Sequence, residues 1–145
     1  MRVTAPAGIH FLAVTPQFTV PDIGRTVEYY RDVFGFQVAG YWDGERVTDA
    51  PGSDSVFAIV RRDQVEVFFS RADGSAVRTG RAEGANDAYF HVTGIDALAA
   101  ELRSRGAEIL DGPDDRSYGQ RELQVRDCNG LILTFAEDTS GRPVR

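Results

Sequence analysis

Hydrophobic and polar positions follow one pattern twice along the chain. In the first copy, residues 15–20 alternate polar and apolar side chains, as a half-buried strand does. A helical pattern follows, with Asp22 as a suitable N-cap and Gly35 as a suitable end. The apolar face of this helix is predicted to be Ile23, Val27, Tyr30 and Phe34. The next strands are predicted over 36–41, 56–61 and 64–70, with a loop over 42–55.

The second copy begins where Phe18-x-Val20-x-x-Ile23 returns as Phe90-x-Val92-x-x-Ile95. Strands are expected over 87–92 and 107–110, a helix over 96–105, and a hairpin of 120–126 and 131–136 around Asn129-Gly130. Because half of such a repeat cannot bury its apolar face alone, the chain is expected to pair two βαβββ modules in one α+β domain. The expected division is an extension over 1–14, modules over 15–71 and 87–138, a linker over 72–86 and a tail over 139–145.

In most of the predicted strands every second residue is apolar, and the residues between them are a mixed, often polar set. Successive strand residues point to opposite faces, so the apolar parity is expected to pack on the helices and the other parity to form an open face. That open face is either a solvated surface or the lining of a pocket, and the alternation of residues alone does not decide between these two alternatives. Phe57, Phe68 and Tyr89 among polar neighbours favour a small-molecule pocket.

Composition narrows the function classes. The chain has 145 residues, 42% of them hydrophobic, which suits one globular domain, and its single Cys128 excludes an intrachain disulfide. Its net charge is −6, with both signs interspersed, so a basic footprint for nucleic acid or anionic membranes is missing. Because the sequence shows no signal-peptide pattern and no long apolar stretch, we expect a cytoplasmic protein. The negative net charge favours a neutral or cationic ligand.

The doubled pattern, together with TVPDIGRTVEYYRDVFGF and YGQRELQVRDCNGLILTF, resembles the glyoxalase/bleomycin-resistance/dioxygenase family of the vicinal oxygen chelate superfamily, over about residues 15–138. The resemblance implies two βαβββ modules whose open, curled mixed sheets surround a cavity. It also implies a homodimer in which that cavity is shared between chains.

Metal-dependent members of this family take His, Gln or Glu ligands from the first and last strand of each module. The resemblance maps those positions onto Thr15, Phe68, Asp87 and Thr134, of which only Asp87 has a side chain suited to ligate a metal. We therefore expect no metal, no cofactor and no catalytic residue. The alternative is a lyase, isomerase or dioxygenase with a shifted metal site, for which the same predicted face supplies Gln17, Glu66, His91 and Glu122.

The metal-free branch of the resemblance is the bleomycin-resistance type, which sequesters a flat cationic drug at a dimer interface. Aromatic rings and carboxylates on the predicted face suit such a ligand, whereas Arg61 and Arg121 would neutralise the acids or bind an anion. A third reading is a filled pocket with a functional dimer surface. The ligand-binding residues expected are Trp42, Phe57, Glu66, Phe68, Asp87, Tyr89, His91, Tyr118, Glu122 and Thr134.

Overall fold

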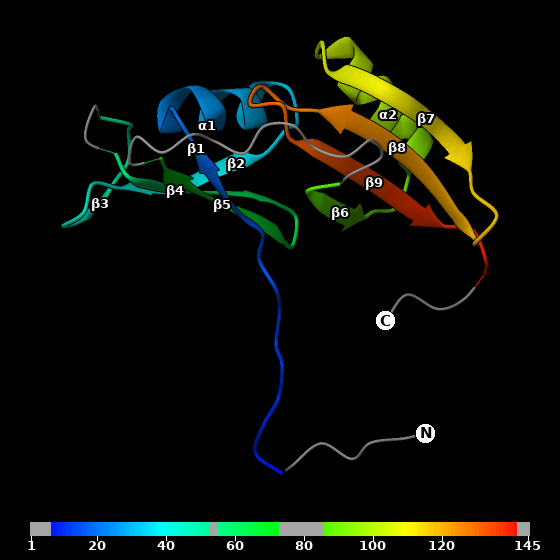
Figure 1. The fold of residues 1–145 in the computed structure, drawn as a ribbon, viewed down its shortest axis with the longest axis horizontal. Coiled ribbons are helices and arrows are strands. Elements are labelled where there is room, and N and C mark those ends of the chain that lie inside the picture. Colours follow the sequence, from blue (N-terminus) through cyan, green and yellow to red (C-terminus); the bar gives the residue numbers. More distant parts are fainter. Residues whose placement is uncertain (1–6, 53–54, 73–85, 142–145) are drawn as a thin grey trace.

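The computed structural model describes residues 7–52, 55–72 and 86–141, and they form two βαβββ modules side by side (Figure 1). The first module contains β1 (Gln17–Val20), α1 (Ile23–Asp32), β2 (Gln37–Trp42), β3 (Val47–Thr48), β4 (Phe57–Arg62) and β5 (Val65–Arg71). The second contains β6 (Ala88–His91), α2 (Ile95–Ser104), β7 (Glu108–Asp115), β8 (Gln120–Arg126) and β9 (Ile132–Asp138). The α+β fold expected from the repeat is confirmed.

Each module builds its own mixed sheet. The first sheet has the order β1-β5-β4-β2-β3 and the second has the order β6-β9-β8-β7. In each, the first strand of the module runs parallel to the last, and the remaining pairs are antiparallel. The equivalent strands thus occupy equivalent places, and β3 is the extra element of the first module.

Both helices lie on the same side of the two sheets, and the opposite side of each sheet, which we call its open face, is left uncovered by the other described elements (Figure 1). The helix pattern predicted for the first module is confirmed: Ile23, Val27, Tyr30 and Phe34 are all buried. The apolar parity of the strands is buried beneath the helices as well, for example at Val60, Val67, Leu123 and Leu133. Removing this apolar surface from water is the main driving force for each module.

Two local predictions need correction. The segment 42–55 was expected to be a loop, but Val47 and Thr48 pair with Trp42 and Tyr41 to form β3. The strand expected over 107–110 continues to Asp115, because register irregularities after Ile109 and Asp111 let the chain keep pairing with β8. A bulge breaks the two-residue alternation by which a strand is recognised in a sequence. The part of β7 beyond Leu110 was therefore not predicted.

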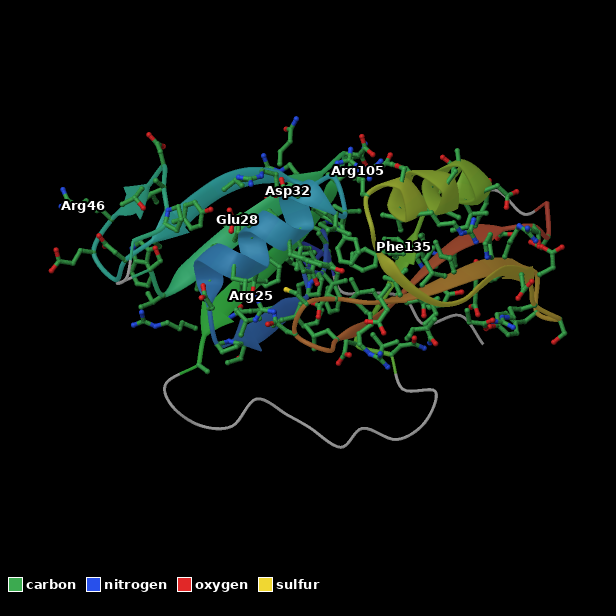
Figure 2. The ribbon with its side chains drawn as sticks, turned by 90° about the horizontal axis from the view of Figure 1, so that it is seen from above. Arg25, Glu28, Asp32, Arg46, Arg105 and Phe135 are labelled. Carbon is green, nitrogen blue, oxygen red and sulfur yellow. The ribbon has the colours of Figure 1, made fainter. Side chains whose placement is uncertain are left out.

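The two modules are joined by a polar and aromatic interface. The hydroxyl of Tyr30 on α1 donates to the buried carboxylate of Asp127, in the β8–β9 turn, over 2.7 Å. Arg62, at the end of β4, donates to Glu101 on α2 and to the Phe34 carbonyl. Figure 2 shows Arg105, directly after α2, near Asp32 at the end of α1, and the Arg105 guanidinium donates to the backbone carbonyl of Asp32 over 3.2 Å. These long-range bonds fix the modules next to each other.

Several sequence expectations fall at the edges of the described chain. Most of the expected linker (72–86), the first residues of the extension and the end of the tail lie outside the described residues, so those boundaries stay predictions. Within the part that the structure describes, no helix is both long enough and apolar enough to cross a membrane.

Candidate ligand-binding site

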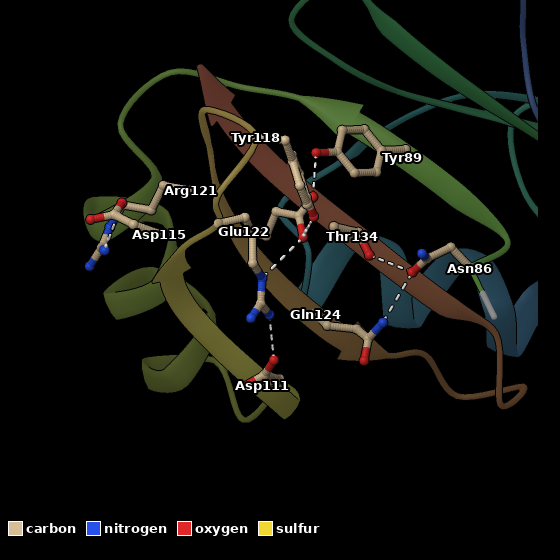
Figure 3. A network of polar contacts seen from close by, with 10 residues as sticks. Asn86, Tyr89, Asp111, Asp115, Tyr118, Arg121, Glu122, Gln124 and Thr134 are labelled. Carbon is tan, nitrogen blue, oxygen red and sulfur yellow. Dashed lines mark hydrogen bonds and ion pairs between the residues drawn. The ribbon is translucent and has the colours of Figure 1, made fainter. Parts of the chain in front are cut away.

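The open face of the second module is organised around one carboxylate, that of Glu122 on β8 (Figure 3). Glu122 accepts hydrogen bonds from the hydroxyls of Tyr89 (2.5 Å) and Tyr118 (2.6 Å) and from Nε of Arg116 (3.2 Å). The residue is only 9% exposed although it points away from the core. A buried carboxylate stays charged only when hydrogen bonds replace its contacts with water, and these three donors provide such bonds.

Strand register and a bulge bring the donors to Glu122. His91 on β6 and Glu122 on β8 flank Ala136 of β9 in one cross-strand row, and Tyr89 lies two residues before His91 on the same face. On the other side, β7 approaches β8 so closely at Gly112 that a Cβ there would lie 2.2 Å from the Glu122 carbonyl oxygen. Only glycine allows this approach, which lets the chain beyond β7 return over the carboxylate.

The turn between β7 and β8 contributes the other two donors. Arg116 bridges Glu122 and Asp111, whose Oδ2 lies 2.5 Å from Nη2 of Arg116. Tyr118 follows two residues later, and Gly119 closes the turn with a φ of +83°. The positive φ favours glycine, so Gly119 suits the turn that directly follows Tyr118.

The electrostatics keep Glu122 ionised. Burial opposes its charge, but the hydrogen bonds from Tyr118, Tyr89 and Arg116 outweigh burial and hold the pKa of Glu122 below its usual value. Burial and the bond to Glu122 raise the pKa of Tyr89, and the bond to Glu122 raises the pKa of Tyr118. Both phenols therefore stay protonated at neutral pH and keep donating to the carboxylate.

A second polar group lies beside this one. Asn86 Oδ1 accepts from the Thr134 hydroxyl over 2.5 Å and from Nε2 of Gln124 over 3.1 Å (Figure 3). Thr134 is buried although it belongs to the open face. The open face of the second module is thus covered in part by its own hydrogen-bonded side chains.

His91 and Asp87 complete the predicted set on this module. The His91 ring lies with its centroid 5.3 Å from that of Tyr89, in an edge-on arrangement, and the residue is exposed. The Asp87 carboxylate accepts from the backbone N–H of Ile132 over 2.8 Å. Asp87 therefore helps to tie the start of β6 to the start of β9, a structural role that the sequence did not indicate.

The open face of the first module carries the remaining predicted residues. Phe57 and Phe68 meet edge to face at 5.2 Å, and Glu66 accepts from Arg61. Trp42 pairs with Phe57 across β2 and β4 and is 42% exposed. Its described residues offer aromatic rings and an ion pair, but none of the charged side chains among them is buried.

The ten predicted residues therefore fall into two groups. Trp42, Phe57, Glu66 and Phe68 lie on the first sheet, and Asp87, Tyr89, His91, Tyr118, Glu122 and Thr134 lie in or beside the second. Sequence reasoning missed Arg116 and Asn86, which complete the two hydrogen-bond groups of the second module. Arg116 lies in the irregular stretch DGPDDRSYG, where periodicity gives no orientation, and only its nearness to Tyr118 hinted at a role.

The side chains considered as metal ligands are dispersed over the described fold or engaged in other contacts. At the positions where the family's enzymes place ligands, Asp87 is engaged with a backbone N–H and Thr134 with Asn86. The shifted set is divided, with Gln17 and Glu66 on the first sheet and His91 and Glu122 on the second. Among the described residues, no group of three or more His, Cys, Asp or Glu side chains is arranged to hold a metal ion.

A separate cavity of about 1240 Å³ lies at the junction of the modules. Its walls are mainly apolar, with Phe36 and Val65 on one side and Leu98 on the other. His91 is the one predicted site residue that lines it, and Gln120 adds a buried Oε1 for which no hydrogen-bond partner is found within the described chain. The cavity is therefore distinct from the hydrogen-bonded group around Glu122 and shares only His91 with the predicted site.

Comparison with known proteins identifies the fold and its relatives. A family model described as the glyoxalase/bleomycin resistance protein/dioxygenase superfamily matches residues 8–135. None of the curated proteins compared matches the chain.

Solved structures of this architecture are similar over nearly the whole chain. The bleomycin-binding protein of bleomycin-producing Streptomyces verticillus, solved with copper(II)-bleomycin, is 25% identical, with a TM-score of 0.62 and coverage of 92% of this chain and 99% of that one. TioX from Micromonospora sp. ML1 is 18% identical (TM-score 0.66, coverage 88% and 99%). A glyoxalase-related enzyme from Clostridium phytofermentans is 17% identical (TM-score 0.68, coverage 92% and 99%).

Proposed function

This chain belongs to the glyoxalase/bleomycin resistance protein/dioxygenase superfamily, and we propose that within it the chain is a metal-free binding protein for a planar, cationic aromatic compound. The proposed action is stoichiometric sequestration in the cytoplasm, as in antibiotic resistance, without turnover. The proposal starts from the open faces described above and from the chemistry of their side chains.

The observation that carries the proposal is the state of the two phenols beside Glu122. A hydroxyl has one proton and two lone pairs, and both protons are committed to the carboxylate. The free lone pairs of Tyr89 and Tyr118 are therefore available to accept from a ligand, and the adjacent negative charge makes them better acceptors. A cation or an N–H-rich group is the complementary partner.

Aromatic rings on both open faces supply the second half of the recognition. Tyr89 and Tyr118 are 40% and 58% exposed, and on the first module Phe57 and Phe68 are half-buried. Exposed rings gain most from stacking on another planar, apolar group, and a cation above a ring adds a further attraction. An aromatic compound with a positive charge would use both contributions.

A homodimer is the second element of the proposal. Both open faces lie on the same side of the molecule, where none of the other described helices or strands covers them (Figure 1). A second copy with its open faces opposed would bring the aromatic face of one module against the Glu122 face of another, and would enclose a site that one chain leaves open. A pocket enclosed in this way buries most of a ligand's surface, as small-molecule sites usually do.

The relative at 25% identity supports the choice of probe, because its structure contains copper(II)-bleomycin. We would titrate the chain with metal-free bleomycin and with copper(II)-bleomycin by calorimetry, and repeat both with a Tyr89→Phe/Tyr118→Phe double variant. The double variant is expected to bind roughly ten-fold more weakly, since it loses two acceptors. Tyr29→Phe, on the helix side of the molecule, is the matched control and should bind as the unchanged chain does.

Two results would overturn this function. Absence of heat and of any melting-temperature shift with either bleomycin form and with a panel of cationic aromatic compounds would remove the binding role. Stoichiometric zinc, nickel, manganese or iron in untagged protein after gel filtration would instead favour the metal-dependent lyase, isomerase or dioxygenase. In that case, His91→Ala should abolish metal retention.

A further inference from the structure

The three hydrogen-bond donors to Glu122 are not held equally. Nε of Arg116 lies 3.2 Å from Oε1 of Glu122. The hydroxyls of Tyr118 and Tyr89 are closer to the carboxylate, at 2.6 and 2.5 Å. A hydrogen bond from a guanidinium to a carboxylate is ordinarily about 2.7–2.9 Å long. The contact between Arg116 and Glu122 is therefore long for two opposite charges, and Arg116 is the donor that can leave most easily.

Arg116 also has a second and closer carboxylate. Its Nη2 lies 2.5 Å from Oδ2 of Asp111, on β7. The backbone of Arg116 is held separately, because its N–H donates to the carbonyl of Gln120 over 2.7 Å. The side chain is 33% exposed, so it has room to move toward water. The guanidinium can therefore leave Glu122 while it keeps Asp111 as its partner and the turn keeps its shape.

Withdrawal of Arg116 would leave neighbouring acceptors with unused lone pairs. Oε1 of Glu122 would lose one of its two donors. The hydroxyl oxygens of Tyr89 and Tyr118 each have a lone pair that their bond to Glu122 does not use. Because both phenols contact the same carboxylate, all of these oxygens lie within one hydrogen bond of it. A primary ammonium group, with three N–H donors and a single positive charge, matches this set of acceptors.

We propose that Arg116 holds the place of the ligand's cation in the unliganded chain, and that the ligand is a primary ammonium attached to an aromatic body. The ammonium enters between Tyr89 and Tyr118. It replaces Arg116 on Glu122, and Arg116 moves fully to Asp111. The inference rests on the proposed function, and it adds the kind of cation and a specificity-determining residue.

The exchange keeps a buried carboxylate hydrogen-bonded at every stage. Glu122 gives up one N–H donor and gains another, so no buried acceptor is left unpaired. A quaternary ammonium carries the same charge but no N–H, and it would displace Arg116 without replacing the lost hydrogen bond. A neutral aromatic compound would not replace the charge either. Sites that recognise a ligand through buried polar groups discriminate strongly against analogues that leave those groups unpaired.

A matched pair of probes tests the kind of cation. We would titrate the unchanged chain by calorimetry with (1-naphthylmethyl)ammonium and with (1-naphthylmethyl)trimethylammonium, which share the ring and the charge and differ in the N–H groups. The primary ammonium is expected to bind roughly ten-fold or more tightly, since only it restores the bond to Glu122. Equal affinities, or tighter binding of the quaternary probe, would overturn the inference.

Two variants test the exchange through effects of opposite sign. Arg116→Met removes the competing cation, so the primary ammonium should bind roughly ten-fold more tightly than it binds the unchanged chain. Asp111→Asn weakens the second partner of Arg116 and keeps the guanidinium on Glu122, so the same probe should bind several-fold more weakly. Weaker binding to Arg116→Met, with an unchanged far-UV spectrum, would show that Arg116 supports the ligand and does not compete with it.

Arg121→Met is the matched control for charge. It removes the same positive charge from the same module, but Arg121 contacts Asp96 and Asp115 and not Glu122. The affinity for the primary ammonium should stay within about two-fold of the unchanged chain, because exposed charges at a distance are screened by salt. A gain as large as that of Arg116→Met would assign the effect to net charge and would contradict the exchange.

The two proposals fail in different ways. If the unchanged chain binds bleomycin but binds the two naphthyl probes equally or not at all, the proposed function stands and the inference about the cation is wrong. If it binds neither bleomycin nor either probe, the proposed function is wrong and the inference falls with it.

Discussion

The two modules have equivalent strands in equivalent places, yet their open faces differ in how the side chains are held. On the second module Glu122, Thr134 and Ala136 are buried on that face, each beneath or beside neighbours from the same module. On the first module the corresponding strands β4 and β5 have no buried residue on the open face, where the side chains of Arg61 and Glu66 are 54% and 31% exposed. One copy of the repeat has a pre-organised polar site, and the other presents a more adaptable aromatic surface.

In the proposed function, the two modules would contribute to ligand binding in different ways. A carboxylate with three donors keeps its position without a ligand, so it provides orientation at little cost in entropy. Aromatic side chains such as Phe57 and Phe68 provide contact area for planar groups. Opposing the two faces in a dimer would combine both properties in one site.

The largest expected effect comes from removing the central carboxylate. Glu122→Leu leaves the hydroxyls of Tyr89 and Tyr118 without their acceptor and removes one of the two carboxylates that Arg116 contacts, and it should lower the free energy of unfolding by about 2 kcal/mol. Glu66→Leu is the matched change on the first module and should cost less than about 0.5 kcal/mol, because its partner Arg61 is more than half exposed. Urea denaturation of both variants measures the difference, and equal losses would contradict the contrast between the faces.

The pH dependence of stability gives a second test. The pKa of Glu122 is lower in the folded chain than in the unfolded one, so its contribution is present above the unfolded value of about 4.3 and is lost as the pH falls through the folded value. Glu122→Gln should therefore be less stable than the unchanged chain at pH 7, by about 1 kcal/mol, and the gap should narrow as the pH falls below the unfolded value. Urea titrations at pH 7 and at pH 3 check this, and a gap as large at pH 3 as at pH 7 would show that charge is not the cause.

The helix N-termini of the modules offer a third comparison. Asp22 caps α1 locally, accepting from the N–H of Arg25, whereas the N-cap of α2 is Gly94, and Glu137 of β9 accepts from the N–H groups of Gly94 and Ile95. Asp22→Ala should cost about 1 kcal/mol. Glu137→Ala should cost about 0.7 kcal/mol, because water replaces part of an exposed charge–dipole contact. Thermal melts of the two variants decide the order, and no loss with Glu137→Ala would show that α2 needs no cap from β9.

The last comparison concerns single hydroxyls on the two faces. Thr134→Val removes the buried donor to Asn86 and should cost about 1 kcal/mol. Ser70→Ala removes the exposed partner of Gln17 and should change stability by less than about 0.5 kcal/mol. Chemical denaturation can resolve this difference, and a reversed order would mean that the first-module face is the more firmly organised one.

The sequence by itself determined the repeat, the helix faces and which strand parity points to the core. Those features depend on short-range periodicity: Ile23, Val27 and Tyr30 lie on one helix face because of their spacing, and Val60 and Val67 are buried because alternate strand residues share a face. The family followed from the same local patterns. Of the site, the pattern placed Tyr89, Glu122 and Thr134 on the open face, but it gave neither their partners nor their burial.

Only the tertiary structure decided which side chains meet. The bond from Tyr30 to Asp127 spans 97 residues, and those from Tyr89 to Glu122 and from Glu137 to α2 span 33 and about 42. Arg116 reaches Glu122 because a bulged β7 returns its turn over the sheet, and a bulge erases the period that a sequence pattern needs. Contacts at such separations depend on sheet register and on how the modules pack, which no local spacing encodes.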